Sequence, residues 1–180
     1  MDSFDLTHFQ INPISERDGW RLCDFIASNT DYLQRYFPIT VAANLTPVLS
    51  NIFLQQKISE FTTGQEFLFT LKEPEHRNII GLAYVKEIDR TKKEAEMAYC
   101  IGYPYKNKGF ASLAVKTLSQ WAMDHQGLQN LRIIVHNSNI SSIKVAENCG
   151  YLWKGTLPKE HIPPGEKPMD MELYVLKNER

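Results

Sequence analysis

The sequence predicts an α+β fold in which a mixed, mostly antiparallel central sheet is flanked by helices. Three strand-like segments follow one another between residues 66 and 103 with only short turns between them, which predicts an antiparallel meander. A strand–helix–strand unit then begins at residue 94 and predicts a parallel neighbour reached by a right-handed crossover. Helical segments with one apolar face precede and interrupt these strands, and such faces are buried by covering a sheet.

Length and composition indicate one ordinary globular domain. The chain has 180 residues, which suits a single domain spanning 1–180. Hydrophobic residues make up 43% and charged residues 23%, and the net charge of -1 argues against nucleic acid as a partner. The first ten residues have no signal-peptide pattern, and no apolar run is long enough to cross a membrane.

The cysteines favour a reducing compartment. The three of them, Cys23, Cys100 and Cys149, are an odd number at wide spacing, which fits neither a disulfide framework nor a zinc site. We therefore expect a cytoplasmic protein that binds no metal and no membrane.

The first elements are a strand and a helix. Residues 8–14 are strand-like, and Ser15 can cap a helix over 16–29, whose apolar side chains supply one face. The aromatic-rich segment 31–40 contains a proline and is predicted to be a structured loop or a short helix.

A second helix is predicted over 46–64, where Thr46 can cap the start, Pro47 suits the first turn and Gly64 ends it. The meander follows. Its predicted strands are residues 66–73, 78–89 and 94–103.

The last third alternates helices and strands. A helix with regularly spaced apolar residues runs to about His125, and β-branched residues then predict a buried strand over 130–136. Polar capping residues and Gly150 predict a short helix over 137–150. The final elements are expected to be strands 151–157 and 170–176, with the Pro-rich loop 158–168 between them.

A basic hinge joins strand 94–103 to the next helix. The first turn of a helix carries N–H groups without partners and a partial positive charge, so anions and above all phosphates bind there. Gly109 would let a ligand approach the backbone, and Lys106 and Lys108 add positive charge. A basic surface turn explains these three residues equally well. The pattern is neither a Walker loop nor a dinucleotide fingerprint.

Two stretches resemble the GNAT superfamily of acyl-CoA-dependent N-acetyltransferases. The hinge resembles the pyrophosphate motif of that family in the residues Lys106, Asn107, Lys108, Gly109, Phe110 and Ala111. A later stretch resembles the family's Asn-x-x-Ser … Gly-Tyr segment in Asn139, Ser142, Gly150 and Tyr151. Together with the order of elements, the resemblance covers most of the chain. It is strongest to the RimJ/RimL-type branch, which acetylates protein N-termini such as those of ribosomal proteins.

The resemblance implies the GNAT fold and acetyl-CoA as cosubstrate. The backbone from Lys106 to Ser112 would hold the diphosphate, strand residues would bond the pantetheine arm where their strand parts from the next one, and Asn139 would reach the pantetheine amides. The implied cofactor residues are Cys100, Ile101, Gly102, Lys106, Asn107, Lys108, Gly109, Phe110, Ala111, Ser112, Asn139 and Ser142. Lys106 departs from the more usual Arg or Gln. Asn139 could equally be a helix cap.

The resemblance also implies direct attack of an amine on the thioester. A backbone amide near Cys100–Ile101 would stabilise the oxyanion. Many relatives place a tyrosine at the position that Ala146 occupies here, so Ser142 is the expected proton donor to the departing thiolate. Glu96 and His136 are candidate bases, with Glu160, His161 or a water chain as alternatives, and an ordinary surface role is open for each of them.

The acceptor is expected to be the α-amine of a protein N-terminus. A small amine such as a polyamine, amino sugar or amino acid is the first alternative, and a non-catalytic acyl-CoA-binding domain is the second. Aromatic residues of segment 31–40 are candidates for the acceptor side, although a core role is open for each. A homodimer is compatible with the branch.

Overall fold

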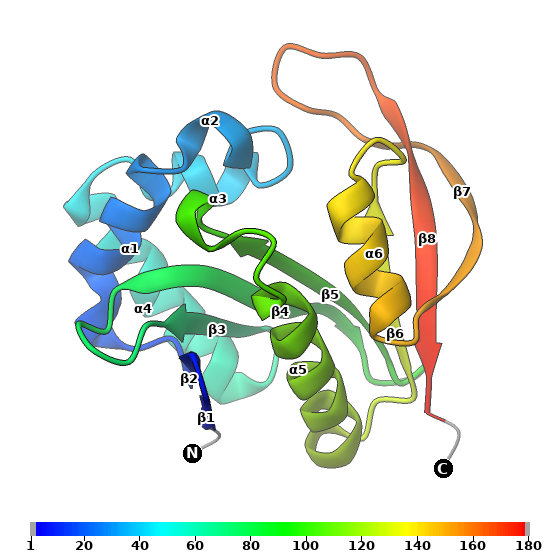
Figure 1. Cartoon of the computed structure of the whole chain (residues 1–180), viewed down its shortest axis with the longest axis horizontal. Coiled ribbons are helices and arrows are strands. Elements are labelled where there is room, and N and C mark those ends of the chain that lie inside the picture. The colour runs from blue at the N-terminus through cyan, green and yellow to red at the C-terminus, as the bar shows by residue number, and fades with distance from the viewer. Residues whose placement is uncertain (1–2, 179–180) are drawn as a thin grey trace. The chain divides into compact units, whose positions relative to one another are not determined.

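The computed structural model describes residues 3–178, so both ends of the predicted 1–180 domain lie outside it (Figure 1). The chain divides into two compact units. One contains the chain up to Ala83 together with Cys100–Lys106, and the other contains Tyr84–Tyr99 and the chain from Asn107 on.

The first unit is built on three antiparallel strands. The strands are β1 (Phe4–Leu6), β2 (Phe9–Pro13) and β3 (Phe67–Lys72), in that spatial order. All six residues of β3 are buried, which fits its mostly apolar sequence. The strand predicted over 8–14 is confirmed, whereas β1 was not predicted.

Helices complete the first unit. The predicted 16–29 helix consists of a 3-10 turn, η1 (Glu16–Asp18), followed by α1 (Gly19–Ala27). Ser15 and Asp18 form a capping box at the start, in which the Ser15 backbone N–H and hydroxyl both donate to Asp18 Oδ2 at 2.9 Å. Segment 31–40 falls in two short helices, which are α2 (Thr30–Leu33) and α3 (Pro38–Ala42).

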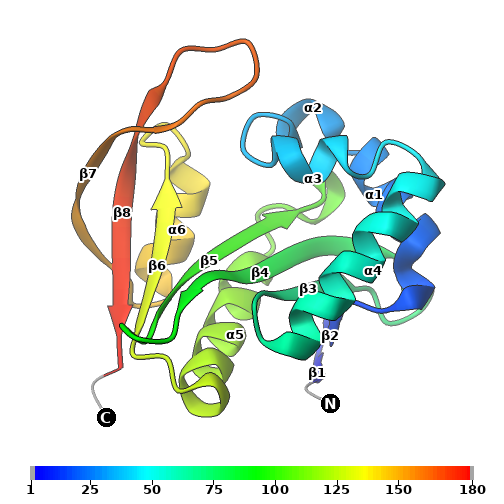
Figure 2. The same cartoon turned by 180° about the vertical axis from the view of Figure 1, so that it is seen from behind.

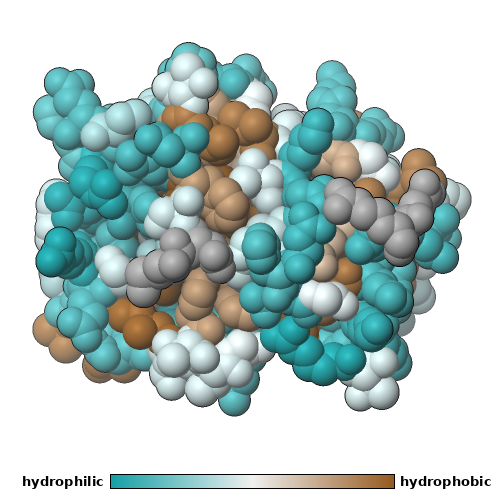
Figure 3. Space-filling view, turned by 90° about the horizontal axis from the view of Figure 1, so that it is seen from below, coloured by the Kyte–Doolittle hydropathy of each residue, from teal (hydrophilic) through white to brown (hydrophobic). Residues whose placement is uncertain are grey.

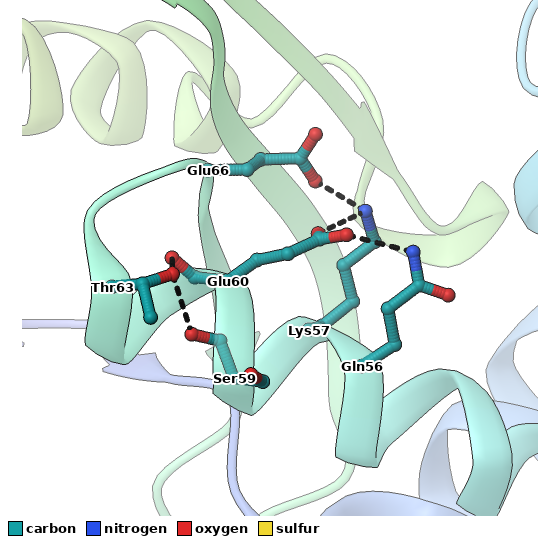
Figure 4. A network of polar contacts seen from close by, with 6 residues as sticks. All are labelled: Gln56, Lys57, Ser59, Glu60, Thr63 and Glu66. Carbon is teal, nitrogen blue, oxygen red and sulfur yellow. Dashed lines mark hydrogen bonds and ion pairs between the residues drawn. The ribbon is translucent and has the colours of Figure 1, made fainter.

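Helix α4 (Pro47–Thr63) has the ends that the sequence predicts. The Thr46 hydroxyl accepts from the Leu49 N–H, Pro47 opens the first turn, and Gly64 adopts a left-handed φ of 71°. The helix packs on α1 and on β3. On its last turns, Lys57 lies between the carboxylates of Glu60 and Glu66, both at 2.7 Å (Figure 4).

The second unit contains the parallel pair that the sequence predicts. Strand β5 (Glu94–Ile101) pairs in parallel with β6 (Asn130–Val135), and β6 pairs antiparallel with β8 (Met169–Lys177) along its whole length. Helices α5 (Phe110–Gln126) and α6 (Ile140–Asn148) contact each other and lie on the same face of these strands (Figures 1 and 2).

The Pro-rich loop is shorter than predicted. We expected a loop over 158–168, but β7 (Leu152–His161) continues through Pro158 and pairs with β8 up to His161. Two features allow this. β7 is the last strand of the sheet, where a proline loses no ladder bond, and Lys159 takes a left-handed φ of 56° within an irregularity of the ladder.

The remaining strand, β4 (Ile79–Asp89), runs from the first unit into the second. The strands form an eight-stranded sheet in the order β1-β2-β3-β4-β5-β6-β8-β7. The β1–β2, β2–β3, β6–β8 and β7–β8 pairs are antiparallel, whereas β5 and β6 are parallel, which confirms the predicted α+β class with a mostly antiparallel mixed sheet. No helix within residues 3–178 is long and apolar enough to span a membrane.

The surface shown in Figure 3 is mostly hydrophilic and is interrupted by hydrophobic residues. One of the exposed large hydrophobic side chains is Tyr103, with 69% of its surface accessible, and this residue belongs to the site described next.

Candidate functional site

The start of α5 is shaped by two left-handed residues. Asn107 has a φ of 60° and Gly109 a φ of 78°, and the helix begins directly afterwards at Phe110. Glycine has no side chain with which to cap the helix, and turns that contain left-handed residues make concave clusters of backbone N–H groups that suit anions. A Cβ built at Gly109 would meet no atom of residues 3–178 within 4 Å, so a ligand can approach this backbone closely.

The chain directly after β5 is hydrogen-bonded to β4 through Gly102. The Gly102 N–H donates to the Ile80 carbonyl at 2.7 Å. Because successive N–H groups of a strand point to opposite sides, the Ile101 N–H points away from β4. The Ile101 carbonyl accepts a hydrogen bond from the Tyr32 hydroxyl, a group 69 residues earlier in the chain.

The close approach of β4 and β5 depends on a glycine. A Cβ at Gly81 would lie 2.7 Å from the Cys100 carbonyl oxygen and 2.9 Å from a methyl carbon of Ile101. The Cys100 side chain itself is buried, and burial raises the pKa of its thiol to about 12. This cysteine is therefore a thiol rather than a thiolate near neutral pH.

Strand β5 pairs with β6 over three residues only. The ladder joins Glu94, Ala95 and Glu96 to Asn130, Leu131 and Arg132. Both strands continue, but β6 beyond Arg132 bonds β8 and has no further register with β5. The residues of β5 that follow Glu96 therefore lie beyond this ladder.

Asn139 caps α6. Its side-chain oxygen accepts from the Ser142 N–H at 3.2 Å, which leaves the amide nitrogen outside this contact. The Ser142 carbonyl accepts from the Tyr99 hydroxyl at 3.3 Å. Burial raises the pKa of Tyr99 well above its ordinary value, so this hydroxyl is a neutral donor. The Ser142 hydroxyl takes no part in these contacts.

The two candidate bases have different surroundings. Glu96 is buried and paired with two cations, with 2.9 Å to Lys86 Nζ and 3.7 Å to Arg132 Nε. His136 follows β6, is half-buried, and its Nδ1 lies 2.7 Å from the Ser138 hydroxyl. The histidine is therefore less constrained by charge than the glutamate.

Two tyrosines enclose the side chain of Lys106. The Lys106 ammonium lies 3.6 Å from the ring centre of Tyr32 and 4.5 Å from that of Tyr103. The sequence predicts Lys106 as a cofactor residue and the aromatic segment 31–40 as part of the acceptor side. It does not predict that Lys106 contacts Tyr32 of this segment. The role of Tyr99 was also missed, although it neighbours the predicted Cys100.

A cavity of about 480 Å³ lies elsewhere in the second unit. Its lining comes from the middle of α5, the start of β7 and the end of β8, and includes Lys116, Cys149 and Lys177. None of the predicted site residues lines it.

The chain is similar to known acetyltransferases. It is 32% identical over 98 residues to a [ribosomal protein uS5]-alanine N-acetyltransferase of Escherichia coli, covering 53% of this chain and 50% of that protein. It is 24% identical over 106 residues to a spermidine N(1)-acetyltransferase of Vibrio cholerae, covering 59% and 61%. The chain thus spans about half the length of the first of these relatives.

The fold has a solved counterpart. The structure of RimL, a ribosomal L7/L12 α-N-protein acetyltransferase in complex with coenzyme A, superimposes with a TM-score of 0.86 at 16% identity, covering 96% of this chain and 95% of that one. The acetyltransferase (GNAT) domain family matches residues 8–152. This match includes β2 to α6, hence the whole hinge and the capped helix after β6, and the chain therefore belongs to the GNAT acetyltransferase family.

Proposed function

We propose that this protein is an N-acetyltransferase that transfers acetyl from acetyl-CoA to a primary amine, and that the amine is the α-amino group of a protein N-terminus. The observation that carries the proposal is the three-residue ladder between β5 and β6. Ile101 lies beyond the end of this ladder, and its N–H points away from β4. In the sequence, Ile101 comes shortly before the amide-rich start of α5. Such a strand end can bond an extended acyl-pantetheine arm as if the arm were an added strand.

The cofactor would be held mainly by backbone groups. In this proposal the amides between Lys106 and Ser112 bind the diphosphate, supported by the left-handed Asn107 and Gly109. Of the predicted residues 100–102, Ile101 bonds the pantetheine arm through its N–H, because the Gly102 N–H is already taken by the Ile80 carbonyl. The Asn139 amide nitrogen bonds the arm as well. The family membership and the coenzyme A complex of the RimL structure support acetyl-CoA as the cosubstrate.

The reaction would proceed by direct attack in a ternary complex. The neutral amine forms a C–N bond to the thioester carbonyl, the Ile101 N–H stabilises the oxyanion, and the C–S bond then breaks. Ser142 gives a proton to the departing thiolate, and the base removes one from the amine. Burial of Cys100 supports direct attack, because its protonated thiol is a poor nucleophile for an acyl-enzyme.

For the base we propose His136 rather than Glu96. The two cations beside Glu96 hold its carboxylate in ion pairs, whereas His136 contacts a neutral hydroxyl. Replacing each in turn by Gln separates them: the pH dependence of kcat/KM should change for His136→Gln and be retained for Glu96→Gln. The reverse result would assign the base to Glu96.

The spermidine N(1)-acetyltransferase relative supports small amines as a second candidate class of acceptor. One screen decides between the classes. Peptides with varied first residues, polyamines, amino sugars and amino acids are offered with acetyl-CoA, and released thiol and acetylated product are measured. Turnover of peptides alone supports the N-terminal proposal, and turnover of polyamines alone overturns it. Binding of acetyl-CoA without turnover of any acceptor would indicate the non-catalytic domain.

We also infer a single catalytic domain in a reducing compartment such as the cytoplasm. The thiols of Cys23, Cys100 and Cys149 are all free, which supports the second point. Sedimentation at micromolar concentration measures whether the domain forms a homodimer.

A further inference from the structure

Tyr32 and Tyr103 form an aromatic cation site. Their rings are nearly perpendicular, with centres 5.8 Å apart and an interplanar angle of 71°. The Lys106 ammonium occupies the space that both rings face, at 3.6 Å and 4.5 Å from their centres. An organic cation within about 6 Å of an aromatic ring centre is attracted by the ring's electron density.

Both tyrosines are fixed in place. The Tyr32 hydroxyl bonds the Ile101 carbonyl, and burial raises the pKa of this phenol, which keeps it protonated. The backbone N–H of Tyr103 donates to the Asn29 side-chain oxygen at 2.9 Å. The rings therefore form a site before any ligand arrives.

This site lies beside the reacting end of the proposed pantetheine strand. Tyr32 bonds the carbonyl of Ile101, and the N–H of the same residue is the proposed oxyanion donor. A cation held on the rings would thus be close to the acyl group that is transferred.

Lys106 can leave the rings without disturbing the fold. The residue is exposed, and its ammonium is held by ring contacts of modest strength at a partly exposed site. It directly precedes the backbone amides proposed to bind the diphosphate. Two negative charges of a diphosphate attract an ammonium more strongly than two neutral rings do.

We propose that Tyr32 and Tyr103 bind a second cationic group of the acceptor, an ammonium or guanidinium that is not itself acetylated, and that Lys106 fills this site until coenzyme A binds. The inference rests on the proposed function, because it assigns part of the acceptor site of that enzyme. It implies that acceptors carrying an additional positive charge are preferred and that they bind after acetyl-CoA.

Matched acceptors test the ring site during turnover. The pairs are 1,4-diaminobutane against 1-aminobutane, and peptides beginning Ala-Lys against Ala-norleucine. In the wild type and in Tyr103→Phe, kcat/KM should favour the cationic member about fivefold, and Tyr103→Leu should reduce the preference to about twofold, because only the Tyr32 ring remains. An equal preference in Tyr103→Leu, or none in the wild type, overturns the ring site. Tyr103 is largely exposed, so its truncation should leave the melting temperature close to that of the wild type.

A binding measurement without turnover tests the role of Lys106. Titration calorimetry with 1,4-diaminobutane should show binding to Lys106→Met without coenzyme A, and binding to the wild type only after coenzyme A is added. Equal binding by both proteins without coenzyme A, or no binding by Lys106→Met, overturns the proposal. A protein that acetylates amines but fails these two tests keeps the proposed function and loses only this inference.

Discussion

Ser142 and Ser141 are neighbouring serines in the first turn of α6 with different surroundings. Ser141 is exposed, whereas Ser142 is half-buried and exchanges backbone hydrogen bonds with Asn139 and Tyr99. Only its hydroxyl is left to act on a ligand, so a substitution that removes the hydroxyl and keeps the backbone is a clean test.

We expect Ser142→Ala to lower kcat about 100-fold, because a positioned general acid contributes at least that much, while the KM for acetyl-CoA stays near the wild-type value. Thiol release under saturating substrates measures both. Ser141→Ala is the matched control and should behave as the wild type. An unchanged kcat in Ser142→Ala would remove the proton-donor role.

Gly81 sets the distance between β4 and the end of β5. Gly81→Ala should lower the free energy of unfolding by about 1–3 kcal/mol, because the new methyl group would meet the Cys100 carbonyl at 2.7 Å. It should also weaken acetyl-CoA binding by shifting Ile101. Thermal melts and calorimetry measure the two effects.

Gly127→Ala provides the comparison for Gly81→Ala. Its Cβ would meet no atom of residues 3–178, although its φ of 67° adds strain of about 1 kcal/mol. This variant should lose stability and keep the wild-type affinity for acetyl-CoA. If Gly81→Ala keeps that affinity too, the strand end does not bind the cofactor.

At the level of residues, the sequence predicts local contacts better than distant ones. The cap at Asn139 and the left-handed Gly109 follow from short motifs. The ion pair of Glu96 with Arg132 and the bond from Tyr32 to Ile101 join residues far apart in the chain, which no local pattern encodes. The ion pairs of Glu96, which bear on its candidacy as a base, are therefore visible only in the folded protein.

Helix α6 offers a way to separate a structural role from a binding role. Asn139→Asp keeps a side-chain oxygen for the Ser142 N–H but removes the amide nitrogen, whereas Asn139→Ala removes both. We expect Asn139→Ala to cost about 1 kcal/mol of stability and Asn139→Asp much less. Both should weaken acetyl-CoA binding about fivefold or more, measured by calorimetry. Wild-type affinity in Asn139→Asp would show that the residue is a cap alone.

The polar cluster on α4 makes stability depend on pH. For Glu60, burial tends to raise the pKa, but hydrogen bonds from Lys57 and Gln56 outweigh it and leave the pKa below its ordinary value. A carboxyl group with a lower pKa in the folded state stabilises the fold above its unfolded pKa and loses this effect as the pH falls through the folded pKa. For Lys57 burial lowers the pKa, yet hydrogen bonds to Glu60 and Glu66 raise it overall.

We therefore expect Lys57→Met to cost about 1 kcal/mol at pH 7, and this difference to shrink below about pH 4 as the carboxyl groups become protonated. It should also shrink at alkaline pH, as the raised pKa of Lys57 is passed. Urea unfolding across pH measures it. Lys144→Met, at an exposed lysine of α6, should show no such dependence. A constant difference from pH 3 to pH 7 would contradict the expectation.

At the level of elements, capping residues predicted the ends of a helix correctly. Thr46, Pro47 and Gly64 mark α4 correctly. β1 was missed because three residues are too few to show a period, and it is recognisable only through its pairing with β2. The extension of β7 past Pro158 was missed because proline argues against a strand unless the strand is known to lie at an edge.

At the level of the whole molecule, cofactor binding should stabilise the fold. Acetyl-CoA at about 100 times its Kd should add about 2.7 kcal/mol to the free energy of unfolding. Hydrogen exchange should slow about tenfold or more at Ile101 and at the start of α5. Unchanged exchange at these residues, or no thermal shift, would contradict the proposed mode of binding.

The fold class was predictable from the order of elements alone, because the meander and the parallel β5–β6 pair leave few alternative topologies. The length of the β5–β6 pairing was not predictable from the sequence. It depends on where β6 bonds β8 instead, and β8 comes from the far end of the chain. The proposed cation site is similarly beyond the sequence, since Tyr32 and Tyr103 meet only in the folded protein.

Because the pairing of β5 with β6 stops at Glu96–Arg132, the strand beyond it offers main-chain groups that every amino acid possesses. Substitutions at these positions change the side chains but keep the main-chain N–H and C=O groups. Laboratory evolution should accordingly alter amine choice through positions such as Tyr103 sooner than it alters the acyl donor.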